Sequence, residues 1–145
     1  MRLVTPLGLV FLIGSPLVAA CDSAERKDAQ IVVEAIRRFR QAQTEDIPVL
    51  VDALKGTECK FEDSCAAKRE CLKTGEPTAK AIKLKANAER VLAGIDSGKV
   101  ETSSAEALTV LTGLDEASKL VKEGQAAIPA CDESVEALKR KYGFY

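Results

Sequence analysis

The chain has 145 residues and a formal net charge of −1, because 21 Lys and Arg residues nearly balance 22 Asp and Glu residues. This balance leaves no basic excess for nucleic-acid binding, so nucleic acid is not an expected partner. The sequence contains no histidine, which removes the commonest general base and the commonest ligand for zinc, copper and haem iron. An ordinary hydrolase is therefore disfavoured, although carboxylates and lysines also perform acid–base chemistry.

The N-terminal segment has the order of a secretory signal peptide. A positive start at Arg2 is followed by a mostly apolar run over residues 3–18 and then by the small residues Ala19 and Ala20. The run is shorter than the ~20 residues that span a bilayer. Its glycines and prolines also weaken it as a permanent helix. We therefore expect residues 1–20 to be a signal peptide that is removed.

The sequence Val18-Ala19-Ala20-Cys21 resembles the lipobox of bacterial lipoproteins. That resemblance implies cleavage before Cys21, lipidation of its sulfur and anchoring to a membrane of the bacterial cell envelope, facing the periplasm or the exterior. An ordinary signal peptidase would also accept a cut after Ala20. Cysteine number favours the lipoprotein, since lipidation uses one of five cysteines and leaves four that can pair. Asp22, the residue after the proposed anchor cysteine, does not decide between the inner and the outer membrane.

Polar residues follow the anchor position. Residues 21–30 predict a lipid-anchored tether that becomes helical, and residues 31–145 predict the folded domain. A first helix is expected from Ala24 to Gln43, because apolar side chains recur there at helical spacing. The predicted buried stripe of this helix comprises Ile31, Val32, Ala35, Ile36, Phe39 and Ala42.

Three helices are expected in the middle of the chain. Residues 48–55 predict either a separate short helix or the kinked end of the first helix, with Asp46 as the cap of a new helix, Pro48 in its first turn and Gly56 as a stop. A second short helix over residues 63–73 is expected to end at Gly75, with Pro77 beyond it. A longer helix over residues 78–95 follows. Its expected buried side comprises Ile82, Leu84, Ala88, Val91, Leu92 and Ile95.

Two further helices are expected in the last third of the chain. A capping box at Ser103 and Glu106 predicts a helix that runs to about Lys122. Gly124 and Pro129 separate it from the final helix. The expected inward residues of the first of these helices are Leu108, Leu111, Leu114, Ala117 and Val121, and those of the second are Cys131, Val135, Leu138 and Tyr142. The chain therefore predicts an all-α fold, a small antiparallel bundle of four to five helices stapled by two disulfides.

The disulfide pairing follows from the expected helix over residues 63–73. Four cysteines allow three pairings. Cys65 and Cys71 would lie about 9 Å apart along that helix, whereas a disulfide needs Cα atoms within roughly 7 Å. A bond from Cys59 to Cys71 would span the whole helix and is disfavoured for the same reason. The remaining pairing is Cys59–Cys65 with Cys71–Cys131.

Motifs for chemistry are lacking in the sequence. Zinc sites with four thiolates normally have C-x₂₋₄-C pairs and thioredoxin-like sites have C-x-x-C, and the cysteine spacings match neither. There is no glycine-rich phosphate loop and no G-x-S-x-G elbow. We therefore expect no metal, no cofactor and no catalytic residues.

Two basic clusters, residues 37–40 and residues 139–141, carry positive charge that anionic lipid headgroups would attract. Solvated helix faces are the simpler interpretation of both clusters. Gly143 is the expected stop of the last helix, which would leave Phe144 and Tyr145 to dock on the bundle or to be recognised by a partner.

Taken together, these features favour a non-enzymatic domain tethered to a membrane through Cys21, which binds or scaffolds another envelope protein. The alternative is a bundle that binds a small ligand in an apolar cavity between its helices. An enzyme is the third hypothesis.

Overall fold

The computed structural model describes residues 23–144, and within that range the chain forms five α-helices and one short 3₁₀ helix, with no strand. The signal segment and Cys21 lie outside the described residues. The predicted all-α fold is confirmed. In chain order the elements are α1 (Ala24–Arg40), η1 (Thr44–Asp46), α2 (Ile47–Gly56), α3 (Glu62–Asp96), α4 (Ala105–Ala126) and α5 (Ile128–Tyr142).

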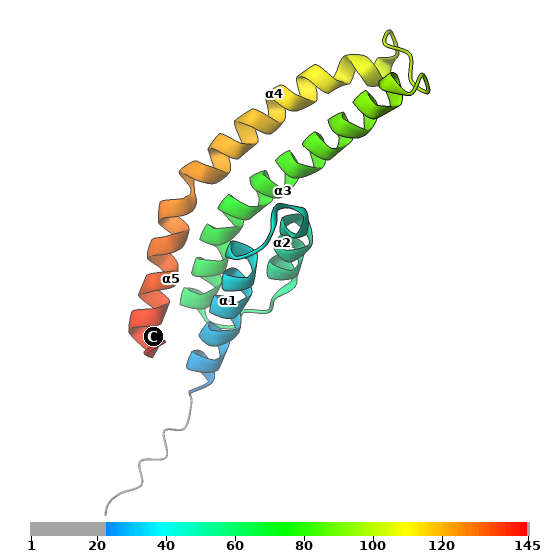
Figure 1. Cartoon of the computed structure of the whole chain (residues 1–145). Helices are drawn as coiled ribbons and strands as arrows, with labels where there is room; N and C mark the ends of the chain where they lie inside the picture. The colour runs from blue at the N-terminus through cyan, green and yellow to red at the C-terminus, as the bar shows by residue number, and fades with distance from the viewer. Residues whose placement is uncertain (1–22, 145) are drawn as a thin grey trace, which may run out of the picture.

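A long curved hairpin forms the frame of the molecule (Figure 1). Helix α3 makes one arm, and α4 and α5 follow one another back along it, separated by Ala127. Helices α1 and α2 lie against the N-terminal half of α3, close to α5. We call this four-helix part the base. Beyond it, residues 78–124 form a two-helix projection that we call the distal hairpin.

The main core lies in the base. Ile31, which was expected in the buried stripe of α1, is instead 58 % exposed and lies at the open edge of the contact between α1 and α2. The C-terminal Phe144 is partly buried against the core, and the guanidinium of Arg26 stands 5.6 Å from its ring centre. Docking of Phe144 on the bundle is therefore confirmed. The buried core residues are Ala29, Val32, Ile36, Phe39, Val51, Leu54, Ala67, Cys71, Ala79, Cys131 and Leu138.

Helix α1 begins at Ala24, as predicted, and ends at Arg40, three residues before the predicted Gln43. Ser23 caps the helix by accepting a hydrogen bond from the backbone N–H of Arg26 at 3.1 Å. Asp28 and Ala29 are already buried in the base. Side chains in the first stretch of the helix therefore contact the core.

Helix α3 corrects the prediction of two separate helices, since it continues through Gly75 and Pro77. Gly75 is buried, and a Cβ there would lie 2.9 Å from Cγ2 of Val51, so the glycine permits α2 to approach α3 closely. Pro77 removes one backbone hydrogen bond, and prolines inside helices are accommodated by bending. Helix α3 is indeed curved (Figure 1). Tertiary contacts outweigh the local stop signals here.

Helix α4 differs from its prediction at both ends. Its cap is Ser104 rather than Ser103, because Oγ of Ser104 accepts a hydrogen bond from the N–H of Ala107 at 3.1 Å. The helix runs past Gly124 to Ala126 instead of ending near Lys122. Helix α5 then ends as predicted at Gly143, whose φ of 71° is in the left-handed region that glycine favours.

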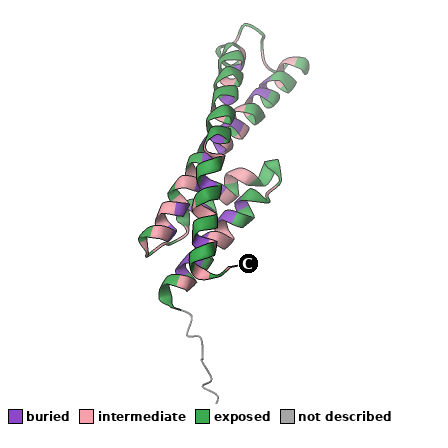
Figure 2. Cartoon of the chain, turned by 90° about the vertical axis from the view of Figure 1, so that its left-hand side faces the viewer, coloured by how far each residue is buried: buried purple, intermediate pink, exposed green. Residues whose placement is uncertain are grey.

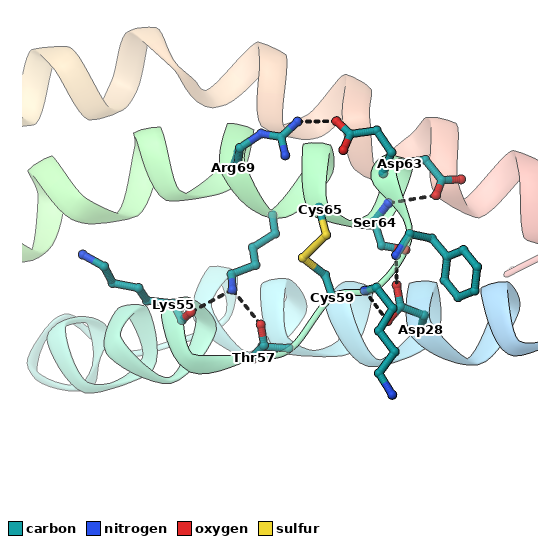
Figure 3. Close-up of a disulfide and its surroundings, with 12 residues drawn as sticks. Asp28, Lys55, Thr57, Cys59, Asp63, Ser64, Cys65 and Arg69 are labelled. Atoms are coloured by element: carbon teal, nitrogen blue, oxygen red, sulfur yellow. Dashed lines mark hydrogen bonds and ion pairs between the residues drawn. A yellow bond between two sulfur atoms is a disulfide. The ribbon is translucent and has the colours of Figure 1, made fainter.

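Both predicted disulfides are confirmed. Cys59–Cys65 joins the loop before α3 to the start of that helix, with Cα atoms 5.3 Å apart (Figure 3). Cys71–Cys131 joins α3 to α5, with Cα atoms 4.5 Å apart. The buried carboxylate of Asp28 accepts hydrogen bonds from the N–H groups of residues 60 and 61 at 3.0 and 3.3 Å. The cysteine-bearing loop is therefore fastened to both α1 and α3.

The end of α2 is held by a side chain of α3. The ammonium group of Lys68 donates hydrogen bonds to the carbonyl oxygens of Lys55 and Thr57, at 2.7 and 2.6 Å. A cation at the C-terminal end of a helix also interacts favourably with the helix dipole. The base is thus joined by covalent, polar and apolar contacts, whereas the distal hairpin depends on the contact between α3 and α4.

Candidate functional site

The distal hairpin has a narrow core made of small side chains. On α4, residues in steps of three and four face α3 and are buried or half-buried, and we call them the inner seam of α4. The corresponding inner seam of α3 packs against it, with Ala88, Val91 and Val110 as its buried centre. Figure 2 shows the buried residues of this hairpin on the facing sides of its two helices. The inner seams comprise Val110, Gly113, Ala117, Leu120 and Gly124 on α4, and Ala81, Leu84, Ala88, Val91 and Ile95 on α3.

A second seam lies beside the first on each helix. At its end nearest the base, Thr78 lies against Gly124 of α4, and Ile47 of α2 lines the same groove. Toward the tip, no helix of the described structure packs against it. Its positions also alternate in steps of four and three, so they share one face of each helix. Leu111 of this outer seam is 74 % exposed, and Leu92 is 47 % exposed. The outer seams comprise Ala107, Leu111, Leu114, Ser118 and Val121 on α4, and Thr78, Ile82, Lys85, Glu89 and Leu92 on α3.

The exposure of these leucines corrects the expected burial in α4. Leu108 and Leu111 were expected to point inward, but they are 68 % and 74 % exposed. Leu114 and Val121, also expected inward, are 38 % and 39 % exposed, whereas Ala117 is buried as expected and Val110, which was not in the expected set, is buried against α3. The spacing of these leucines shows correctly that α4 has an apolar side. The prediction that this side faces α3 was wrong.

An apolar groove of about 360 Å³ lies between the outer seams. Thr44 of η1 and Ile47 of α2 contribute to its lining where the hairpin meets the base. The groove is open to solvent and is lined mainly by aliphatic side chains, with Lys85 as its charged member. Its lining residues are Thr44, Ile47, Thr78, Ala81, Ile82, Lys85, Leu114, Ala117, Ser118 and Val121.

The two arms of the distal hairpin carry opposite charge. Residues 78–93 of α3 contain four cations and one carboxylate, a net charge of +3. Residues 105–118 of α4 contain three carboxylates and no cation, a net charge of −3. Lys80 and Glu116 pair across the hairpin at 2.5 Å. The groove is therefore bordered by a basic helix on one side and an acidic helix on the other.

The basic cluster at residues 37–40 is engaged within the molecule. Arg37 and Arg38 both bind Glu34, at 2.7 and 2.9 Å, and these hydrogen bonds lower the pKa of Glu34 to about 2. Arg40 pairs with Asp132 of α5. These ion pairs fit the interpretation of the cluster as a solvated helix face. They also border a larger open depression of about 690 Å³ between α1 and the end of α5.

The basic cluster at residues 139–141 is engaged in a similar way at the end of α5. The ammonium of Lys141 and the hydroxyl of Tyr142 each donate to Oδ2 of Asp63 at 2.7 Å, and the N–H of Ser64 donates to Oδ1. Partial burial raises the pKa of the Asp63 carboxyl, but the hydrogen bonds from Lys141 and Tyr142 outweigh it, and the net pKa is lowered. Asp63 therefore fastens the end of α5 to the first turn of α3.

Residues 23–144 contain no candidate metal site, because no three His, Cys, Asp or Glu side chains come together there as ligands for a metal ion. None of the helices in this range is long and apolar enough to cross a membrane. Comparison with protein-family models found no match, and comparisons with curated proteins and with solved structures also found no similar protein.

Proposed function

We propose that the mature protein is a lipoprotein of the bacterial cell envelope, anchored through Cys21, and that it binds another protein through the distal hairpin. Its role in this proposal is non-enzymatic binding or scaffolding. The observation that carries the proposal is the outer seam, with Leu111 74 % exposed and Leu92 47 % exposed on neighbouring helices. Contiguous apolar surface of this kind marks interaction sites on soluble domains.

The orientation of the molecule is compatible with such a role. Helix α1 starts at the end of the base, whereas the loop between α3 and α4 lies at the opposite end of the molecule (Figure 1). An anchor at Cys21, two residues before Ser23, would hold the base near the membrane and direct the distal hairpin away from it.

The alternative function is binding of a small apolar ligand in the groove. Its volume of about 360 Å³ lies within the range of small-molecule sites, roughly 300–1,000 Å³. A ligand that binds the native state would raise the unfolding temperature further as its concentration increases, whereas a protein partner would be detected by cross-linking.

The anchor is tested by intact mass spectrometry of the membrane-extracted protein. We expect a chain that begins at Cys21 and carries acyl chains, and we expect Cys21→Ser to abolish both acylation and membrane retention. An unlipidated mature chain in the soluble fraction would contradict the anchor. It would not affect the binding surface, which is tested separately.

The binding surface is tested by photo-cross-linking in cells. Benzoyl-phenylalanine is placed at Leu111 in the outer seam or, as a matched control, at the adjacent exposed Thr112. We expect a discrete cross-linked protein band from position 111 and none from position 112. Equal cross-linking from both positions, or none from either, would contradict a specific binding site on the outer seam of α4.

A further inference from the structure

We propose that the Cys59–Cys65 disulfide is a redox-sensitive site, which a dithiol reductant opens while Cys71–Cys131 and the fold stay intact. The site lies in the base, where the loop after α2 meets the first turn of α3 (Figure 3). It does not involve the outer seams of the distal hairpin, so this inference is independent of the proposed binding surface.

The first argument is the access of a reductant to the sulfur atoms. Cys59 and Cys65 are only partly buried, whereas Cys71 and Cys131 are completely buried in the core. In thiol–disulfide exchange a thiolate must reach one of the two sulfur atoms, and exposed disulfides are therefore the labile ones. We expect a reductant to reach Cys59–Cys65 in the folded molecule. It should reach Cys71–Cys131 only after α3 and α5 separate locally.

The second argument is that polar contacts hold the cysteine-bearing loop independently of the disulfide. The carboxylate of Asp28 on α1 accepts hydrogen bonds from the backbone N–H groups of the two residues that follow Cys59. On the other side of the disulfide, the ammonium of Lys68 binds two carbonyl oxygens at the end of α2 (Figure 3). Neither set of contacts uses a sulfur atom. Opening the disulfide therefore leaves the loop fastened to both α1 and α3.

The third argument is the short loop that this disulfide closes. Its two cysteines are six residues apart, whereas those of Cys71–Cys131 are 60 residues apart. In the chain-entropy description, removing the cross-link of a short loop gives the unfolded chain less additional freedom than removing that of a long one. The open form should therefore keep most of the stability of the fold, and Cys71–Cys131 still joins α3 to α5 in it.

The reaction transfers two electrons and two protons from the dithiol to the protein. A thiolate of the dithiol attacks one sulfur of Cys59–Cys65, the bond between the two cysteines breaks, and the other cysteine leaves as a thiolate that takes up a proton. The second thiol of the reductant, as its thiolate, then attacks the first sulfur of the reductant in the mixed disulfide. The remaining cysteine is released and protonated. The dithiol becomes an internal disulfide, and the protein carries two free thiols.

The order of opening is tested on the mature chain carrying Cys21→Ser, which leaves four cysteines. The protein is incubated with dithiothreitol at neutral pH, samples are quenched by alkylation, and peptides are identified by mass spectrometry. We expect Cys59 and Cys65 to be reduced at least about tenfold faster than Cys71 and Cys131, because exchange at the buried pair waits for the core to open. Simultaneous reduction of all four cysteines, or earlier reduction of the buried pair, would overturn the proposal.

The fold of the open form is tested on the double variant Cys59→Ser and Cys65→Ser, in which two hydroxyls take the place of the two thiols. We expect circular dichroism to show the helical content of the wild type. Amide hydrogen exchange should still be slow at the N–H groups of residues 60 and 61, which Asp28 binds. In the same background, Asp28→Ala should make these two groups exchange faster. Loss of their protection in the double variant itself would show that the disulfide holds the loop, and would overturn the proposal.

Discussion

The carbonyl oxygen of Thr74 lies only 2.9 Å from the position that a Cβ atom on Gly124 would occupy. The hydroxyl of Thr78, which donates to that same carbonyl at 2.8 Å, would lie 2.6 Å from the added atom. This close approach joins α3 to α4 near the point where α4 passes into α5. A glycine in the interior of α4 therefore serves the contact between two helices.

Gly124→Ala is expected to destabilise the protein, although alanine is the better helix former by about 1 kcal/mol. The added methyl group would meet backbone, and overpacking of this kind costs about 1–3 kcal/mol. Gly113→Ala is the matched control on the same helix, because nothing lies within 4 Å of its Cβ position. The free energy of unfolding of this control variant should rise by up to about 1 kcal/mol. Urea unfolding measures both, and a stabilised Gly124→Ala would contradict the close contact.

The two disulfides are expected to contribute unequally to stability. In the chain-entropy description, a loop of 60 residues closed by Cys71–Cys131 is worth about 4 kcal/mol, and one of six residues closed by Cys59–Cys65 about 2 kcal/mol. Replacing each pair by alanines should therefore lower the free energy of unfolding more for the first pair. Equal losses in urea unfolding under oxidising conditions would indicate that native-state contacts, rather than loop length, set the contribution.

Acid should weaken the link that Asp63 makes between α3 and α5. Its pKa is lowered in the folded state, so its contribution to stability is present above its ordinary pKa of 3.8 and is lost as the pH falls through the folded value. We expect Asp63→Asn to unfold more easily at neutral pH and to lose less stability between about pH 5 and about pH 2 than the wild type.

The neighbouring Glu62→Gln is the control for that pH experiment. Glu62 is largely exposed and pairs with Arg69 at the surface, where ion pairs contribute little. This variant should keep the pH dependence of the wild type. If the wild type and Asp63→Asn lose the same amount of stability in acid, other carboxylates determine the pH dependence of stability.

Much of the fold could be predicted because helical periodicity is a local property of the chain. Apolar side chains at three- and four-residue steps, together with cap and stop residues, located the helical segments, and the assumption that Cys65 and Cys71 share a helix was enough to select the disulfide pairing. The prediction that a helix ends at Gly75 and Pro77 was wrong. The local helix-breaking tendency of these two residues is outweighed by contacts that only the folded molecule makes. Gly75, for example, lies against Val51, which is distant in the sequence.

The candidate site could not be predicted, and α4 shows why. Its most apolar residues, Leu108 and Leu111, were assigned to the core, but the side that faces α3 is lined by smaller residues such as Ala117 and Gly124. Periodicity shows which residues share a face of a helix. It does not show which of two adjacent faces meets a neighbour, because that depends on how closely the backbones approach.

The unbroken length of α3 determines how far the tip of the hairpin lies from the base. At 1.5 Å per residue, its 35 residues reach about 50 Å from the disulfide-stapled base to the tip of the hairpin. With the proposed anchor at Cys21, the helix would act as a rigid spacer that holds the hairpin tip at a fixed height above the lipid surface. Inserting or deleting seven residues, about two helical turns, in both arms would change this height by about 10.5 Å while keeping the seams in register.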